Sequence, residues 1–199
     1  MQIKHAVRIV GILLAAGRSE RFGSDKLLVA LPSAFDDIAA GTPIGVAACR
    51  HLVAALPETI AVVRPDDRML ADRLRNAGAY VIECPRAQEG MGASLACGVM
   101  ASPDASGWIV ALADMPWIRP ATIQSVAAAL AAGADIVAPT YRVERGHPVG
   151  FAQRHYAALA ASTGDLGARA IVTAHRDQVT LLPTDDAGVM RDIDEPRQL

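Results

Sequence analysis

Short apolar segments alternate with longer helical patterns along much of the chain. The segment 7–16 is apolar and rich in β-branched residues, which is typical of a strand buried on both faces. Further strands are predicted at 59–63, 79–84, 108–112 and 135–140, and helices at 42–56, 66–76, 91–101 and 120–132. This alternation favours right-handed crossovers and a mostly parallel sheet with helices on both faces. We therefore expect an α/β fold.

The last part of the chain has shorter segments. A basic turn and a short segment at 148–151 precede helices at 152–161 and 166–175 and a last strand at 179–182. The chain has 199 residues, of which 52% are hydrophobic and 20% are charged, as in a folded domain with a sizeable core. We expect residues 1–199 to form a single domain. Its first helix should begin with Thr42 as the N-cap and Pro43 as the first helical residue.

The stretch LLAAGRSERFGSDK at 13–26 combines a strand end, a glycine turn and several cations. In open α/β sheets ligands bind at the carboxyl ends of strands, and Gly17 leaves backbone N–H groups accessible to an anion. Arg18, Arg21 and Lys26 add positive charge on a solvent-facing loop, so the stretch favours polyphosphate binding. Its spacing is neither that of a Walker P-loop nor that of the dinucleotide fingerprint. A surface turn with solvated basic residues is the alternative.

Acidic residues follow the strand at 108–112 and occur again near the C-terminus. An unpaired carboxylate at Asp114 would be costly, so this residue either caps the next turn or binds a hard cation. We favour Mg²⁺, because this ion takes one or two carboxylates together with phosphate oxygens. Asp192 and Asp194 alternate about an apolar residue and offer a second metal ligand, with Asp192 as the first candidate. Asp185 and Asp186 are predicted to lie in a solvated turn.

Three glycine-containing turns supply further candidate contacts. In EGMGASL at 89–95, Gly90 permits close approach of a ligand and Ser94 can hydrogen-bond a base or ribose, with an ordinary glycine turn as the alternative. His147 shares a rigid turn with Arg145, where it contacts a phosphate or heterocycle or else is an exposed turn residue. Asp165, in GDLGAR at 164–169, is predicted to cap the helix that follows.

The net charge and the cysteine content limit the possible binding partners and the cellular compartment of the protein. The formal net charge of -2 provides no general attraction for nucleic acid, so we expect a small-molecule partner. No apolar run has the length of a membrane span, and residues 1–5 lack the layout of a signal peptide, so we expect a cytoplasmic protein without a membrane partner. Cys49, Cys84 and Cys97 are odd in number and widely spaced, which favours reduced structural thiols over disulfides or zinc ligands.

Six segments occur together in a defined order: LAAGRSERFGSDK, EGMGASL, ALADMP, GHPVGF, GDLGAR and DIDEP. In this combination the chain resembles the molybdenum-cofactor nucleotidyltransferases, and among them most closely the molybdopterin cytidylyltransferases. The resemblance covers nearly the whole chain. It implies a Rossmann-like three-layer αβα nucleotidyltransferase fold with a mostly parallel mixed sheet and Mg²⁺ as cofactor. The implied reaction transfers a nucleoside monophosphate from a nucleoside triphosphate to a phosphorylated pterin and releases pyrophosphate.

The resemblance also implies roles for residues at matching positions. The nucleotide-binding loop is formed by Leu14, Ala15, Ala16, Gly17 and Arg18. The triphosphate is held by Arg21 and Lys26, the Mg²⁺ by Asp114, the base and ribose by Gly90 and Ser94, and a loop on the second-substrate side includes His147. Guanylyl-transferring relatives usually have Leu-Ala-Gly-Gly where this chain has Leu-Ala-Ala-Gly, so the likeness favours CTP. The segment 31–41 is longer than the short turn common in the family.

Two alternatives remain open. Another transferase of the same fold would use GTP or act on a sugar phosphate, whereas a non-catalytic protein would bind nucleotide or cofactor and carry it to an apoenzyme. Lys26 and Asp114 favour chemistry over binding alone. A molybdoenzyme apoprotein is a candidate partner.

Overall fold

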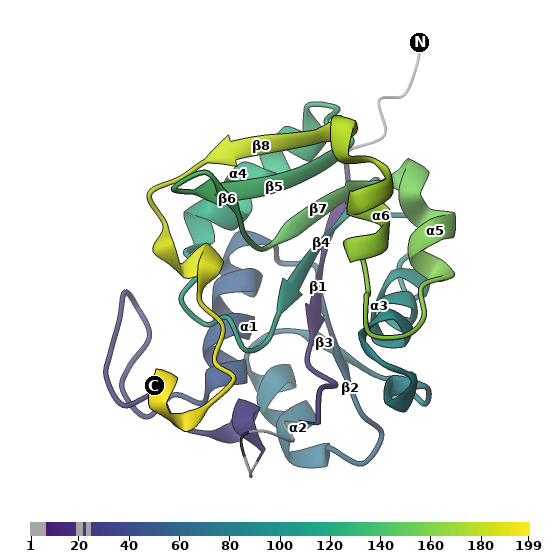
Figure 1. Cartoon of the computed structure of the whole chain (residues 1–199). Coiled ribbons are helices and arrows are strands. Elements are labelled where there is room, and N and C mark those ends of the chain that lie inside the picture. The colour runs from purple at the N-terminus through teal and green to yellow at the C-terminus, as the bar shows by residue number, and fades with distance from the viewer. Residues whose placement is uncertain (1–6, 19–21, 23–24) are drawn as a thin grey trace.

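The computed structural model describes residues 7–18, 22 and 25–199 and contains a mixed eight-stranded sheet with helices on both faces (Figure 1). The strands are β1 (Ile9–Leu14), β2 (Thr59–Val63), β3 (Tyr80–Glu83), β4 (Gly107–Leu112), β5 (Ile136–Tyr141), β6 (Glu144–Arg145), β7 (Val149–Ala152) and β8 (Val179–Pro183). The α-helices are α1 (Ile44–Ala55), α2 (Arg68–Asn76), α3 (Met91–Met100), α4 (Pro120–Ala131), α5 (Tyr156–Ala160) and α6 (Arg169–Ala174). None of these helices has the length and apolar character needed to span a bilayer.

Strand β1 lies inside the sheet, whose order is β3-β2-β1-β4-β7-β5-β6, with β8 beside β5. It runs parallel to β2 and β4, whereas β7 runs antiparallel to both β4 and β5. Because successive side chains of a strand point to opposite faces, Leu13 packs with α1, α2 and α4, and Ile12 packs with α3, α5 and α6. The predicted three-layer α/β fold with a mostly parallel mixed sheet is confirmed.

The segment 31–41 folds into a closed lobe. Ala30 and Pro43 pair in an antiparallel bridge at its base, and Ile38 at its far end is buried in the core. Because this pairing keeps the chain extended through Pro43, helix α1 begins at Ile44. The prediction that Thr42 caps this helix is therefore wrong.

Two of the three cysteines form a disulfide, which corrects the prediction of reduced thiols. Cys84 follows β3 and Cys97 lies in α3, and the turn between these elements brings their Cα atoms to 5.9 Å, within the range that a disulfide requires. Their separation along the chain is 13 residues, and only the packing of α3 against the sheet reveals their proximity. Cys49 is free and buried, and burial raises the pKa of its thiol to about 12, as expected for a structural cysteine.

The predicted solvated turn is confirmed for Asp185 and wrong for Asp186. The side chain of Asp185 is 89% exposed, whereas Asp186 is only 2% exposed. The Asp186 carboxylate accepts hydrogen bonds from the N–H of Gly188 at 3.0 Å, the N–H of Arg119 at 2.8 Å and the hydroxyl of Thr122 at 2.7 Å. Asp186 thereby ties the segment after β8 to the start of α4.

Replacing Asp186 by alanine should lower the free energy of unfolding by about 2 kcal/mol or more, because three donors lose their buried acceptor. The matched change Asp185→Ala removes an exposed carboxylate and should alter it by less than about 0.5 kcal/mol. Thermal or urea unfolding of the two variants measures the difference. Equal stabilities would contradict the structural role of Asp186.

Candidate active site

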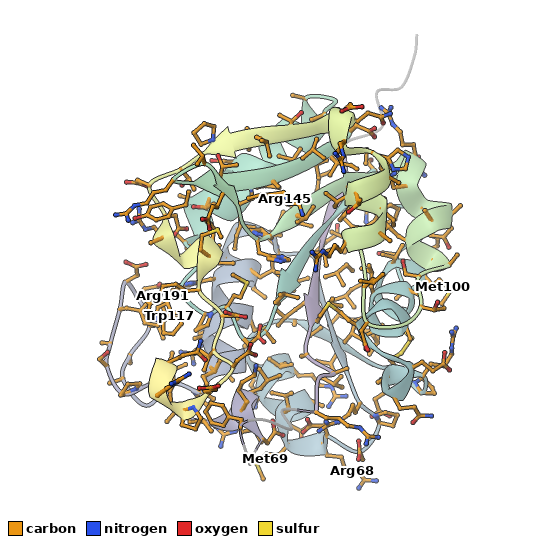
Figure 2. All side chains as sticks on the ribbon, viewed as in Figure 1. Arg68, Met69, Met100, Trp117, Arg145 and Arg191 are labelled. Atoms are coloured by element: carbon orange, nitrogen blue, oxygen red, sulfur yellow. A yellow bond between two sulfur atoms is a disulfide. The ribbon has the colours of Figure 1, made fainter. Side chains whose placement is uncertain are left out.

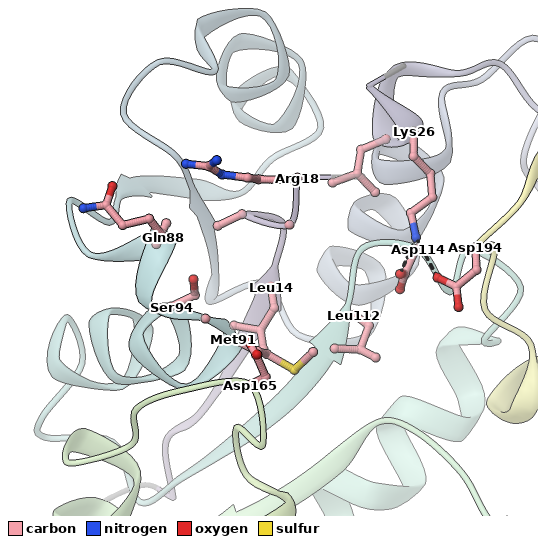
Figure 3. A pocket seen from close by; sticks show the side chains of 15 residues that line it. Leu14, Arg18, Lys26, Gln88, Met91, Ser94, Leu112, Asp114, Asp165 and Asp194 are labelled. Carbon is pink, nitrogen blue, oxygen red and sulfur yellow. Dashed lines mark hydrogen bonds and ion pairs between the residues drawn. The ribbon is translucent and has the colours of Figure 1, made fainter. Parts of the chain in front are cut away.

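A cavity of about 540 Å³ lies at the carboxyl ends of β1 and β4 (Figure 3). The predicted residues that line it from the first loop are Leu14, Ala16, Gly17, Arg18 and Lys26. The others are Gly90, Ser94 and Asp114. Segments that are far apart in the sequence therefore meet where parallel strands end, which is the usual place for a ligand in a sheet of this kind.

Three further predicted residues, Ala15, His147 and Asp192, do not line the cavity. Ala15 is 2% exposed, and its N–H donates to the carbonyl of Val62 at 2.9 Å, which extends the pairing of β1 with β2. Ala15 therefore shapes the loop from beneath rather than by contact with a ligand. His147 and Asp192 come from neighbouring turns, and Arg21 lies outside the described residues.

The register of the sheet places Asp114 beside the first loop. Leu14 and Leu112 are register partners at the ends of β1 and β4, and the N–H of Ala113 donates to the carbonyl of Leu14 at 3.1 Å. The loops that follow β1 and β4 therefore begin side by side at the same edge of the sheet. From the C-terminal segment, the N–H of Ile193 donates to the carbonyl of Asp114 at 3.0 Å. Three parts of the chain are thus joined at one edge of the sheet.

Lys26 is 8% exposed and lies in the 3-10 helix Lys26–Leu28, which corrects the expectation of a solvent-facing residue. Its neighbour Leu27 packs into the core, and this holds the short helix against the sheet. The Lys26 Nζ lies 2.8 Å from Asp114 Oδ2 and 3.3 Å from Asp194 Oδ1. An ammonium group this far removed from water requires such partners.

The second oxygen of Asp114, Oδ1, is buried and has no hydrogen-bond partner in the described part of the chain. The side chain of Asp114 accepts from Lys26 Nζ, and a capping bond from a backbone N–H is not seen among the described residues. A buried carboxylate oxygen without a donor is suited to a hard cation such as Mg²⁺. Residues 7–18, 22 and 25–199 contain no group of three His, Cys, Asp or Glu side chains that could hold a metal. Asp114 therefore fits a metal whose other ligands come from phosphate and water.

Of the two C-terminal carboxylates, Asp194 is the one that reaches the cavity. It lines the cavity and pairs with Lys26. Asp192 is exposed and does not line the cavity. Metal ligation by Asp192 stays a prediction.

His147 is held in the turn before β7. Its N–H donates to the carbonyl of Val189 at 2.9 Å, and its Nδ1 is buried and unpartnered among the described residues. Burial lowers the pKa of the imidazole, and the nearby charge of Asp114 opposes this shift. The alternative of an exposed turn histidine is therefore wrong. Contact of His147 with a second substrate stays a prediction.

Asp165 lines the cavity instead of capping a helix, which corrects the prediction from GDLGAR. Helix α6 begins later, at Arg169, and Ala168 precedes it without a side-chain cap. Gly164 and Gly167 adopt φ angles of 65° and 50°, a left-handed conformation that makes the segment turn. The two glycines that flank Asp165 indicate a turn in the sequence, but they do not show that the turn faces the cavity.

The comparisons with known proteins identify the family of this chain. The sequence model of the MobA-like NTP transferase domain matches residues 11–179. This chain belongs to that family. It therefore carries a nucleotidyltransferase domain, as predicted. A comparison with curated protein sequences finds no match.

Solved structures show the same fold. Rv0371c from Mycobacterium tuberculosis H37Rv is 27% identical, with a TM-score of 0.76 over 98% of this chain and 96% of that one. A complex of Rv0371c with manganese is 26% identical, with a TM-score of 0.67 over 89% of this chain and 88% of that one. Molybdopterin-guanine dinucleotide biosynthesis protein A from Archaeoglobus fulgidus is 18% identical, with a TM-score of 0.62 over 94% and 93% of the chains. At that identity the last comparison shows the fold alone.

Replacing Lys26 by alanine should weaken nucleoside triphosphate binding and slow turnover, because the cavity loses an ammonium group that faces it. The melting temperature should also fall, since Asp114 and Asp194 lose their shared partner. Lys26→Arg keeps the charge and should retain part of the affinity. Nucleotide titration combined with thermal unfolding measures both effects, and unchanged affinity in a folded Lys26→Ala protein would refute the assignment.

Proposed function

We propose that this protein transfers CMP from CTP to a phosphorylated pterin, the molybdenum cofactor, in a Mg²⁺-dependent reaction that releases pyrophosphate. The observation that carries the proposal is the pairing of Lys26 with Asp114. Within the described residues, the other oxygen of Asp114 is buried without a partner, in a cavity that two glycine turns border. The manganese bound to the related Rv0371c supports a divalent metal.

In this proposal the residues of the chain bind and orient the nucleotide and neutralise the charge of its phosphates. Lys26 has three N–H donors, of which two face Asp114 and Asp194, so one remains for the triphosphate. Arg18 lines the same cavity and adds positive charge. Asp114 would hold the metal, which supplies neutralisation of phosphate charge when bound. An oxygen of the acceptor phosphate attacks the α-phosphorus in line and the bond to pyrophosphate breaks, so no protein nucleophile is needed.

The first loop supports CTP over GTP. Ala16 lines the cavity, and Ala15 is buried directly before it. The methyl group of Ala16, where guanylyl-transferring relatives usually have glycine, leaves less room for a purine. The order Leu-Ala-Ala-Gly at 14–17 therefore agrees with a pyrimidine nucleotide.

The acceptor is proposed from the likeness to the molybdenum-cofactor nucleotidyltransferases, and a molybdoenzyme apoprotein would receive the product. Guanylyl transfer, transfer to a sugar phosphate, and nucleotide or cofactor binding without catalysis are the alternatives. A pyrophosphate-release screen of four nucleoside triphosphates against phosphorylated acceptors separates them. A binding protein would release none with any acceptor.

CTP should be preferred over GTP when both are supplied at equal concentration. The reason is the limited space beside Ala16, which penalises the larger base. Competition between the two nucleotides, followed by the identity of the nucleotide transferred, measures the preference. Transfer of GMP in place of CMP would overturn the cytidylyl assignment while leaving the family unchanged.

Asp114→Asn should abolish metal-dependent transfer and leave the protein folded. Asparagine keeps the size of the side chain but removes the charge that a divalent cation needs. Asp185→Asn is the matched control, because the Asp185 side chain is 89% exposed and outside the cavity. Turnover of both variants at saturating Mg²⁺ is the measurement. Equal and small effects at the two positions would refute the metal site.

A further inference from the structure

The segment 163–167 packs against the turn that opens α3. The N–H of Gly92 donates to the carbonyl of Gly164 at 2.7 Å. Gly90 has a φ of 108°, and a Cβ at this position would lie 2.5 Å from Asp165 Oδ1 and 2.6 Å from the carbonyl carbon of Gly164. Glycine is therefore required at position 90, and the carboxylate of Asp165 is held directly beside it.

The carboxylate of Asp165 is free to meet a ligand. It lines the cavity, and within the described residues no side chain or backbone group hydrogen-bonds it or forms an ion pair with it. Figure 3 shows Asp165 beside Met91, on the α3 side of the cavity, whereas Lys26 lies with Asp114 and Asp194 on the other side. One side of the cavity therefore has an ammonium group paired with two carboxylates, and the other has a carboxylate without a partner among the described residues.

An ionised carboxylate only accepts hydrogen bonds and repels phosphate. The phosphates of a nucleotide are better placed near Lys26, which keeps one N–H donor for them beside the metal that Asp114 would hold. The group beside Asp165 must carry N–H or O–H donors. The resemblance to the family implies that Gly90 and Ser94 belong to a loop for the base and ribose, and Asp165 is adjacent to Gly90. A nucleotide presents such donors as the hydroxyls of its ribose and, in cytosine, as an exocyclic amine.

We propose that Asp165 selects the base of the nucleotide by accepting a hydrogen bond from its exocyclic amine. Cytosine presents an amine where uracil presents a carbonyl oxygen, which the carboxylate would repel. Asp165 is therefore the residue that would distinguish CTP from UTP, two nucleotides that a steric filter at Ala16 cannot separate. This inference rests on the proposed nucleotide site and does not depend on the acceptor.

The test is equilibrium binding of CTP and of UTP to the whole protein with Mg²⁺ and without acceptor. The wild type should bind CTP more tightly, and Asp165→Asn should reduce the ratio of the two affinities by about tenfold or more. The amide has no charge and can donate to the uracil oxygen that the carboxylate would repel. Asparagine preserves the size of the side chain, and thermal unfolding verifies the fold. Asp104→Asn removes an exposed carboxylate in the turn before β4 and should leave the ratio unchanged.

An unchanged CTP to UTP ratio in folded Asp165→Asn would overturn the inference, and so would a wild type that binds both nucleotides equally. If the wild type instead prefers GTP, the proposed cytidylyl function fails. The role of Asp165 is then decided by GTP against ITP, which lacks the exocyclic amine, with the same expected loss of discrimination in Asp165→Asn.

Discussion

The ion pair between Lys26 and Asp114 joins the segments on which the cavity depends. Their side chains are only 10% and 24% exposed, and charges so far removed from water are stable only in each other's presence. Lys26 follows β1, Asp114 follows β4, and Asp194 brings the C-terminal segment to the same ammonium. The ammonium of Lys26 therefore joins the segments after β1 and β4 to the C-terminal segment.

The central part of the fold could be predicted because its signals are local. The run 7–16 is apolar on both faces of β1, and in a parallel sheet the loops that follow such strands must share one edge. This reasoning predicts Gly17, Lys26, Ser94 and Asp114 at one edge of the sheet, and all four line the cavity. The expected weakening of nucleotide binding in Lys26→Ala tests the same reasoning in solution.

The features that the sequence does not predict depend on packing between segments that are far apart in the chain. The alternation at 192–194 puts both carboxylates on one face of an extended chain, but which of them meets Lys26 depends on the bond between Ile193 and Asp114. The burial of Asp186 and the disulfide of Cys84 with Cys97 likewise depend on helices that dock from elsewhere. Asp165 lies at the cavity because the N–H of Gly92, at the start of α3, donates to the carbonyl of the neighbouring Gly164.

The lobe 31–41 supports the site from outside. Its Phe35 lies 6.3 Å from the ring of Trp117, and the guanidinium of Arg191 stacks on Trp117 at 3.9 Å (Figure 2). Trp117 follows Asp114 by three residues, and Arg191 precedes Asp194 by the same number. Cation–π stacking therefore joins the two segments whose carboxylates hold Lys26, and the lobe packs against that stack. The lobe thus has a structural explanation at the site that requires no contact with a substrate.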